Sequence, residues 1–75
     1  MKELVEYIAK ALVEEKSAVV VKENKRDKST LLELSVAPAD MGKVIGKQGR
    51  IARSIRTVLK AYATKNGEKA NLDIL

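Results

Sequence analysis

The hydrophobic and polar positions of this 75-residue chain follow two different periods, and the changes of period divide it into elements. Residues 2–15 carry apolar side chains three or four positions apart, with charged side chains outside that stripe. This spacing is typical of one face of a helix. The pattern therefore predicts an amphipathic helix over 2–15. Its predicted core-facing residues are Leu4, Val5, Ile8, Ala11 and Leu12.

Two strands are predicted next, with a polar stretch between them. The first is the β-branched run at 18–21, and the second is 30–36, where leucine and valine alternate with glutamate and serine. Strict alternation is typical of a half-buried strand. The polar residues 22–29 are expected to form a solvated hairpin tip.

Two helices and a final strand complete the predicted order. Pro38 suits the first position of a short helix over about 38–45, because its missing N–H costs nothing there. A longer helix is predicted over about 49–65, and alternation in 70–75 predicts a last strand. The order is α-β-β-α-α-β, so we expect an α+β domain with three helices on one face of a three-stranded sheet. The predicted apolar face of the longer helix comprises Ile51, Ala52, Ile55, Val58, Leu59 and Tyr62.

Composition indicates one globular domain, residues 1–75, without catalytic chemistry. The chain is 45% hydrophobic and has no cysteine and no histidine. It therefore lacks the usual general base, the thiol nucleophile and the imidazole and thiolate metal ligands, and we expect no enzyme activity, metal or cofactor. Asp40 and Glu33 could pair as acid and base, but we favour a helix-start residue and a solvent-facing strand residue. The N-terminus lacks a signal-peptide core and no apolar run approaches a membrane span, so a cytoplasmic location is expected.

Charge is distributed unevenly along the chain. The formal net charge is +5, yet residues 1–40 and 68–75 each carry a net charge of −1. The segment between them holds seven basic residues and no acidic one. A block of one sign in a chain that otherwise mixes its charges indicates a surface for a polyanion. The basic residues of this block are Lys43, Lys47, Arg50, Arg53, Arg56, Lys60 and Lys65.

Within this block, the tetrapeptide Gly46-Lys47-Gln48-Gly49 joins the two predicted helices. Gly46 is expected to end the first helix in a left-handed conformation, which costs other residues about 1–2 kcal/mol. Gly49 is expected to let another backbone come close. The amides that open the next helix should present partial positive charge to an anion such as a sugar-phosphate backbone. A plain turn between helices is the alternative, and the Walker nucleotide-binding pattern is absent.

The string Val44-Ile45-Gly46-Lys47-Gln48-Gly49 resembles the V-I-G-x-x-G signature of the KH domain, whose loop clamps about four backbone nucleotides of single-stranded RNA. The element order is that of a type II KH domain. Residues 37–52 are similar to the small stand-alone bacterial KH proteins of the KhpA (YlqC) family. The resemblance implies single-stranded RNA binding without catalysis, as an RNA chaperone or post-transcriptional regulator. It also implies a homodimer, or a heterodimer with a larger KH-containing protein of the KhpB (Jag) type.

The same resemblance assigns roles to individual residues. It implies that Ile45 lies on the floor of a base-binding groove, between the helix from Arg50 and the strand at 72–74. Ala52 stands where many KH domains place a large aliphatic residue, with Ile51 one position earlier. A protein-interaction or dimerisation module with residual or no RNA binding is the alternative function. The RNA-binding residues implied are Lys43, Ile45, Gly46, Lys47, Gln48, Gly49, Arg50 and Arg53.

Overall fold

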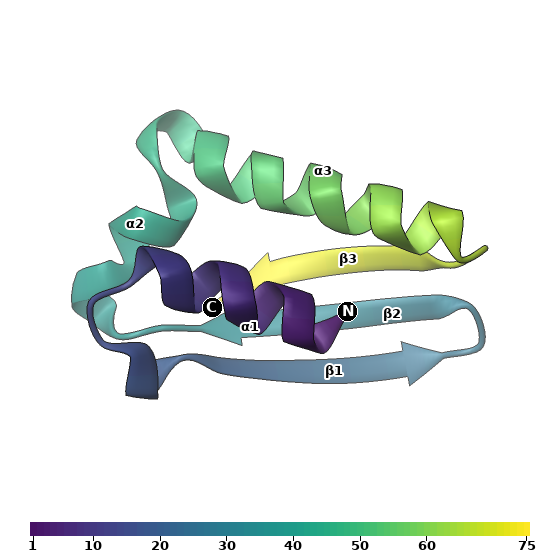
Figure 1. Cartoon of the computed structure of the whole chain (residues 1–75), viewed down its shortest axis with the longest axis horizontal. Coiled ribbons are helices and arrows are strands. Elements are labelled where there is room, and N and C mark those ends of the chain that lie inside the picture. The colour runs from purple at the N-terminus through teal and green to yellow at the C-terminus, as the bar shows by residue number, and fades with distance from the viewer.

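The computed structural model of the protein describes residues 1–75, and its helices and strands are shown in Figure 1. Three short 3₁₀ turns, at Lys16–Ala18, Pro38–Asp40 and Lys47–Gly49, separate some of these elements. The observed order agrees with the predicted α-β-β-α-α-β. The helices and strands are α1 (Lys2–Leu12), β1 (Val20–Arg26), β2 (Ser29–Ser35), α2 (Met41–Ile45), α3 (Arg50–Lys65) and β3 (Lys69–Ile74).

The three strands form one sheet in the order β1-β2-β3. β1 and β2 pair antiparallel, whereas β2 and β3 pair parallel with Leu32 opposite Leu72. The parallel connection contains α2 and α3, so α3 runs back along β3 (Figure 1). β3 pairs with β2 alone, so it is an edge strand, and it lies beside α3 (Figure 1).

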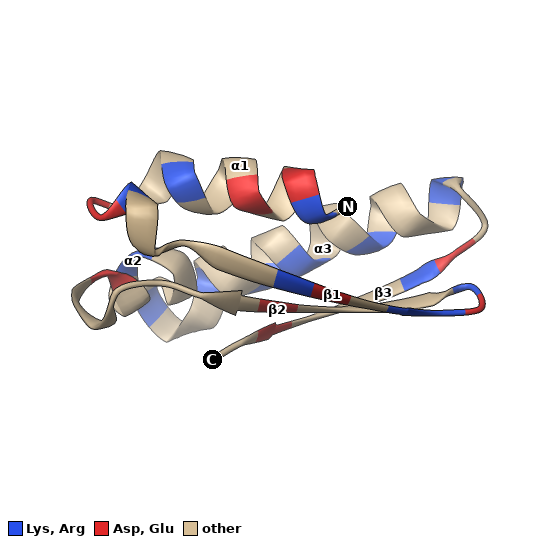
Figure 2. Ribbon diagram, turned by 90° about the horizontal axis from the view of Figure 1, so that it is seen from below, with Lys and Arg blue, Asp and Glu red and all other residues tan.

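All three helices cover the same face of the sheet, as the turned view in Figure 2 and the burial pattern indicate. Along β2, Leu32 and Leu34 are fully buried, whereas Leu31 and Glu33 on the other face are only half-buried. A sheet with one covered face shows this alternation. The α+β fold with three helices on one face is therefore confirmed.

The core is built from the covered sheet face and one stripe of each helix. From α3, Ala52, Ile55, Leu59 and Ala63 are buried, which is the 3–4 spacing of one helical face. In α1 the predicted Val5 is buried and the predicted Leu4 and Ile8 pack against the core, but the end of the predicted stripe is wrong. The buried residues of α1 are Val5 and Ala9, whereas the predicted Ala11 and Leu12 are exposed.

Two predicted boundaries were wrong. The strands continue through the polar stretch predicted as a hairpin tip, and only Asp27 and Lys28 form the turn. β1 lies at the sheet edge and buries only Val21, so charged side chains on both of its faces remain solvated. The first helix ends at Leu12, three residues early, because the amides of 14 and 15 bond to a carboxylate elsewhere in the chain.

Candidate functional site

The glycine loop lies between α2 and α3 at one end of the long axis (Figure 1). Three of its four residues have positive φ. Gly46 lies at φ 76°, ψ 175°, and Gln48 and Gly49 lie at φ 57° and 73° with ψ near zero, in the left-handed region. The loop therefore breaks the helical path twice, which turns its middle residues out into solvent.

The two glycines have roles that differ from the predicted ones. Gly46 occupies a backbone region that is essentially restricted to glycine, and a Cβ there would lie 2.5 Å from Cγ1 of Ile51. Gly49 is the left-handed residue, and no atom lies within 4 Å of where its Cβ would be. The close packing thus occurs at Gly46 against Ile51, while the space at Gly49 faces outward and is open to a ligand. Ala52 is buried in the core face of α3.

The backbone amides at this turn are less available than predicted. The N–H of Gly49 donates to the carbonyl of Gly46 at 3.1 Å, and the N–H of Arg50 donates to the carbonyl of Lys47. These loop carbonyls satisfy two of the amides that were expected to face an anion. Attraction of an anion therefore depends mainly on the side chains around the loop.

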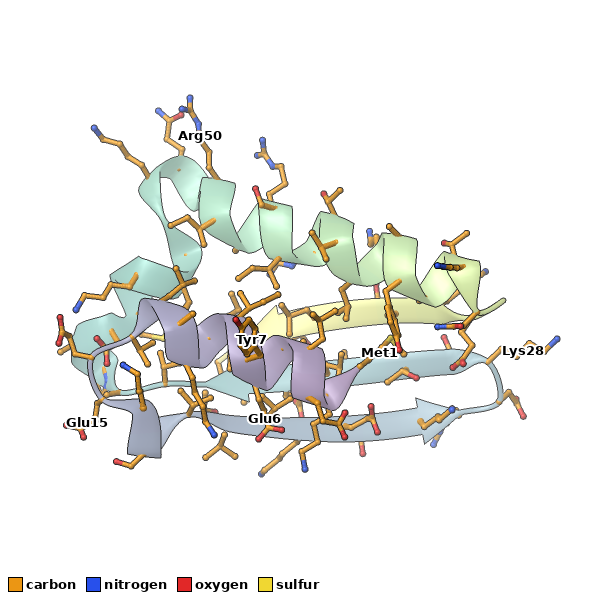
Figure 3. All side chains as sticks on the ribbon, in the orientation of Figure 1. Met1, Glu6, Tyr7, Glu15, Lys28 and Arg50 are labelled. Carbon is orange, nitrogen blue, oxygen red and sulfur yellow. The ribbon has the colours of Figure 1, made fainter.

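Those side chains are exposed and cationic. Lys47, Gln48, Arg50 and Arg53 are all exposed, and Nη2 of Arg50 donates to Oε1 of Gln48 at 3.3 Å. None of the three cations is within ion-pair distance of a carboxylate. Figure 3 shows Arg50 pointing away from the body of the molecule, and Figure 2 shows no acidic residue on α3. The loop and the exposed face at the start of α3 are therefore electropositive.

Lys43 has a different environment from the other predicted site residues. Its Nζ lies 3.2 Å from Oδ1 of Asp40 and 3.5 Å from Oε1 of Glu14. The hydrogen bond to Asp40 raises the pKa of Lys43 above its ordinary value, and the nearby Glu14 carboxylate adds to this. Lys43 already has two anionic partners, so it is less free to bind a phosphate than Lys47.

Asp40 lies at the start of α2, as predicted, and it also makes contacts that the sequence did not indicate. It is buried, and its two carboxylate oxygens accept hydrogen bonds from the amides of Glu14 and Glu15 at 3.1 and 3.0 Å. The Glu15 and Glu14 amides, followed by Lys43, lower the pKa of Asp40. Asp40 thus ties α2 and its loop to the segment after α1. It is not paired with Glu33, which lies on the uncovered face of the sheet.

A groove of about 440 Å³ runs between α3 and β3. The groove lies between the helix and the strand that the resemblance gave as walls, but Ile45 and the glycine loop do not line it. Ile45 is 36% exposed and lies beside the loop, at the end of α2. No three His, Cys, Asp or Glu side chains gather in a group that could hold a metal ion. None of the helices has the length and apolar composition of a membrane span. The lining residues include Leu31, Arg56, Leu59, Lys60, Leu72 and Asp73.

This element order, with a turned-out Gly-x-x-Gly loop before the longest helix, defines a KH domain of the type II arrangement. The family model for the KhpA/KhpB KH domain matches residues 2–74, and the chain belongs to this family. The identification made from residues 37–52 is therefore confirmed.

Relatives match the chain over its length. "RNA-binding protein KhpA" of Clostridium perfringens is 57% identical over 75 residues, which is 100% of both chains. The protein of the same name from Aquifex aeolicus is 51% identical over all of this chain and 95% of its own. Among solved structures, Era in complex with MgGDPNP and nucleotides 1506–1542 of 16S ribosomal RNA matches with a TM-score of 0.60. It is 22% identical and covers 97% of this chain but 28% of the Era chain, so it shows the fold alone.

Proposed function

We propose that this protein binds single-stranded RNA in the cytoplasm by clamping the RNA backbone with the Gly46–Gly49 loop, and that it acts as an RNA chaperone or post-transcriptional regulator. The observation that carries the proposal is the exposed loop with positive φ at three of its four residues, beside the unpaired cations Lys47, Arg50 and Arg53. The full-length relatives named as RNA-binding proteins support it.

Each residue of the loop contributes differently to binding the RNA backbone in this proposal. The missing side chain at Gly49 leaves open space in which a sugar-phosphate backbone can approach the main chain, while Gly46 allows the turn to pack against Ile51. Lys47 offers a mobile ammonium, while Arg50 offers a planar fork that matches two phosphate oxygens. Gln48 adds a neutral donor between them.

Three other predicted residues act around the loop in this proposal. Arg53 lies one helical turn beyond Arg50 and extends the positive surface along α3. Ile45, half-exposed at the end of α2, offers apolar surface to a base. Lys43 acts indirectly, because its bonds to Asp40 and Glu14 hold α2 in place.

Fluorescence anisotropy tests the proposal with a labelled single strand of about eight nucleotides and with the matching duplex. We expect binding to the single strand, with an affinity that falls as salt rises. If about three phosphates are neutralised, the slope of log affinity against log salt should be roughly −2. Tighter binding to the duplex, or a slope near zero, would contradict the proposal.

We propose, as a second role, a homodimer or a heterodimer with a larger KhpB-type protein. Large apolar side chains stay exposed on the helical side of the molecule, with Tyr7 of α1 at 75% and Val58 and Tyr62 of α3 at 50% and 48%. Exposed apolar groups that gather on one side are typical of contact surfaces. Val58 lies about 13 Å along α3 from the glycine loop, so both roles are compatible.

A further inference from the structure

Arg56 is held in one orientation by the sheet. Its Nε donates a hydrogen bond of 3.0 Å to the main-chain carbonyl of Leu72, and its side chain is half-buried between α3 and β3. β3 is an edge strand, so this carbonyl faces outward and would otherwise have no partner in the sheet. No carboxylate lies within ion-pair distance of Arg56. The two Nη nitrogens therefore remain available as a fixed fork of donors.

The groove in front of this fork suits one nucleobase. Its volume of about 440 Å³ lies within the range of about 300–1,000 Å³ that is usual for small-molecule sites. Leu59 and Leu72 are buried beneath the groove and offer little surface, whereas Arg56 and Lys60 supply positive charge and Asp73 supplies negative charge. A base edge carries hydrogen-bond donors as well as acceptors, so it can pair with the Asp73 carboxylate and with a cation, whereas a phosphate offers acceptors only. The chemistry of the lining thus favours a base over the RNA backbone.

We infer that Arg56 makes this groove selective for guanine. The inference rests on the proposed RNA-binding function. The Hoogsteen edge of guanine presents two adjacent acceptors, O6 and N7, which match a pair of arginine N–H donors. Adenine presents an acceptor beside an amino donor, cytosine presents a donor, and uracil offers a single acceptor there. With Nε already bound to Leu72, the Nη pair is left for this bidentate contact.

The position of Arg56 fits the same RNA path. It lies seven residues after Gly49, which is about 10 Å along α3, on the side of the helix that faces β3. Nucleotides next to those clamped by the loop therefore place a base within reach of the groove. Arg56 is a specificity-determining residue in this scheme, and the loop supplies the sequence-independent affinity.

The test compares eight-nucleotide RNAs that are all uridine except for one central position, which is G, A, C, U or 7-deazaguanine. Anisotropy with the full chain should show the G strand binding about tenfold more tightly than the A strand. The 7-deazaguanine strand, which lacks the N7 acceptor, should lose most of that advantage. Equal affinity for the G and 7-deazaguanine strands would overturn the inference in the parent protein itself.

Two variants test whether the preference for guanine depends on the side chain of Arg56. Arg56→Lys retains the charge and loses the fork, so the ratio of G to A affinity should fall to about one. Arg53→Lys, one turn earlier on α3, should leave that ratio near tenfold even if it weakens both complexes. A G to A ratio that survives in Arg56→Lys would overturn the inference. Binding to every strand without base preference refutes this inference alone, whereas no binding to any strand refutes the proposed function as well.

Discussion

Replacing Gly46 with alanine should be the most destabilising single change in the glycine loop. The backbone at φ 76°, ψ 175° costs a residue with Cβ about 1–3 kcal/mol. The new Cβ would also lie 2.5 Å from Cγ1 and 2.8 Å from Cβ of Ile51, and overpacking of this kind costs about 1–3 kcal/mol. The sum of about 2–6 kcal/mol is a large part of the stability of a small domain, which is about 5–15 kcal/mol.

Two other glycines provide matched controls. At Gly49 the backbone is left-handed but the space is open, so replacement by alanine should lower the free energy of unfolding by only about 1–2 kcal/mol. At Gly42, within α2, φ is not positive and the space is also open. Replacing it with alanine should therefore raise the free energy of unfolding by about 0.5–1 kcal/mol. The predicted order of stability is Gly42→Ala, the parent, Gly49→Ala and then Gly46→Ala.

Urea and thermal denaturation followed by circular dichroism measure this series. Each kcal/mol should move the Tm by about 4–8 °C in a domain of this size. If Gly46→Ala is no less stable than Gly49→Ala, the close contact with Ile51 adds nothing to the cost of a side chain at position 46, contrary to this prediction.

Two further changes probe other parts of the structure. Asp40→Asn should lower the Tm at pH 7, because the buried carboxylate holds two amides and Lys43. The pKa of Asp40 is lowered by folding, so its contribution is present above about pH 4 and is lost as the pH falls through the folded-state pKa. The Tm difference between parent and variant should narrow toward pH 2, and a constant difference would contradict this assignment. Replacing both Val58 and Tyr62 by serine should abolish self-association, measured by sedimentation at about 100 μM, well above a typical micromolar affinity. If the parent protein is already monomeric at that concentration, the proposed homodimer is excluded.

Local pattern predicted those elements whose boundaries depend on local chemistry. The apolar stripe of α3 and the glycine after α2 placed both helices near their observed limits. The end of α1 could not be predicted in this way, because it depends on Asp40, which lies 25 and 26 residues from the amides it binds. The hairpin was misjudged for a similar reason, since only the sheet order shows that β1 is an edge strand where charged residues are tolerated.

In the candidate site, too, the sequence predicted local features but not contacts between distant residues. The spacing of Gly46 and Gly49 predicted a loop with special backbone angles, but not which glycine packs against a neighbour. That distinction depends on where the side chain of Ile51 lies. The bond from Arg56 to Leu72 joins residues 16 apart across a helix and a strand, and no sequence spacing indicates it. By contrast, the i, i+3 spacing of Asp40 and Lys43 was a readable signal for their ion pair.

We expect RNA binding to depend on the charge of the loop, and replacing Lys47 and Gln48 together by aspartate reverses that charge. Both side chains are exposed, and aspartate tolerates the left-handed backbone at position 48. The charge of these two positions changes from +1 to −2. At about 4 Å and an effective dielectric near 20, each new contact with phosphate costs up to about 4 kcal/mol before salt screening.

The matched control is the double variant Lys22→Asp, Asn24→Asp, which makes the same change in net charge at exposed positions of β1. Anisotropy with single-stranded RNA and a thermal melt are measured on both variants. We expect the loop variant to stay folded and lose RNA binding, and the β1 variant to retain most of its RNA binding. A folded loop variant that binds RNA as tightly as the parent would show that this loop is only a turn between two helices.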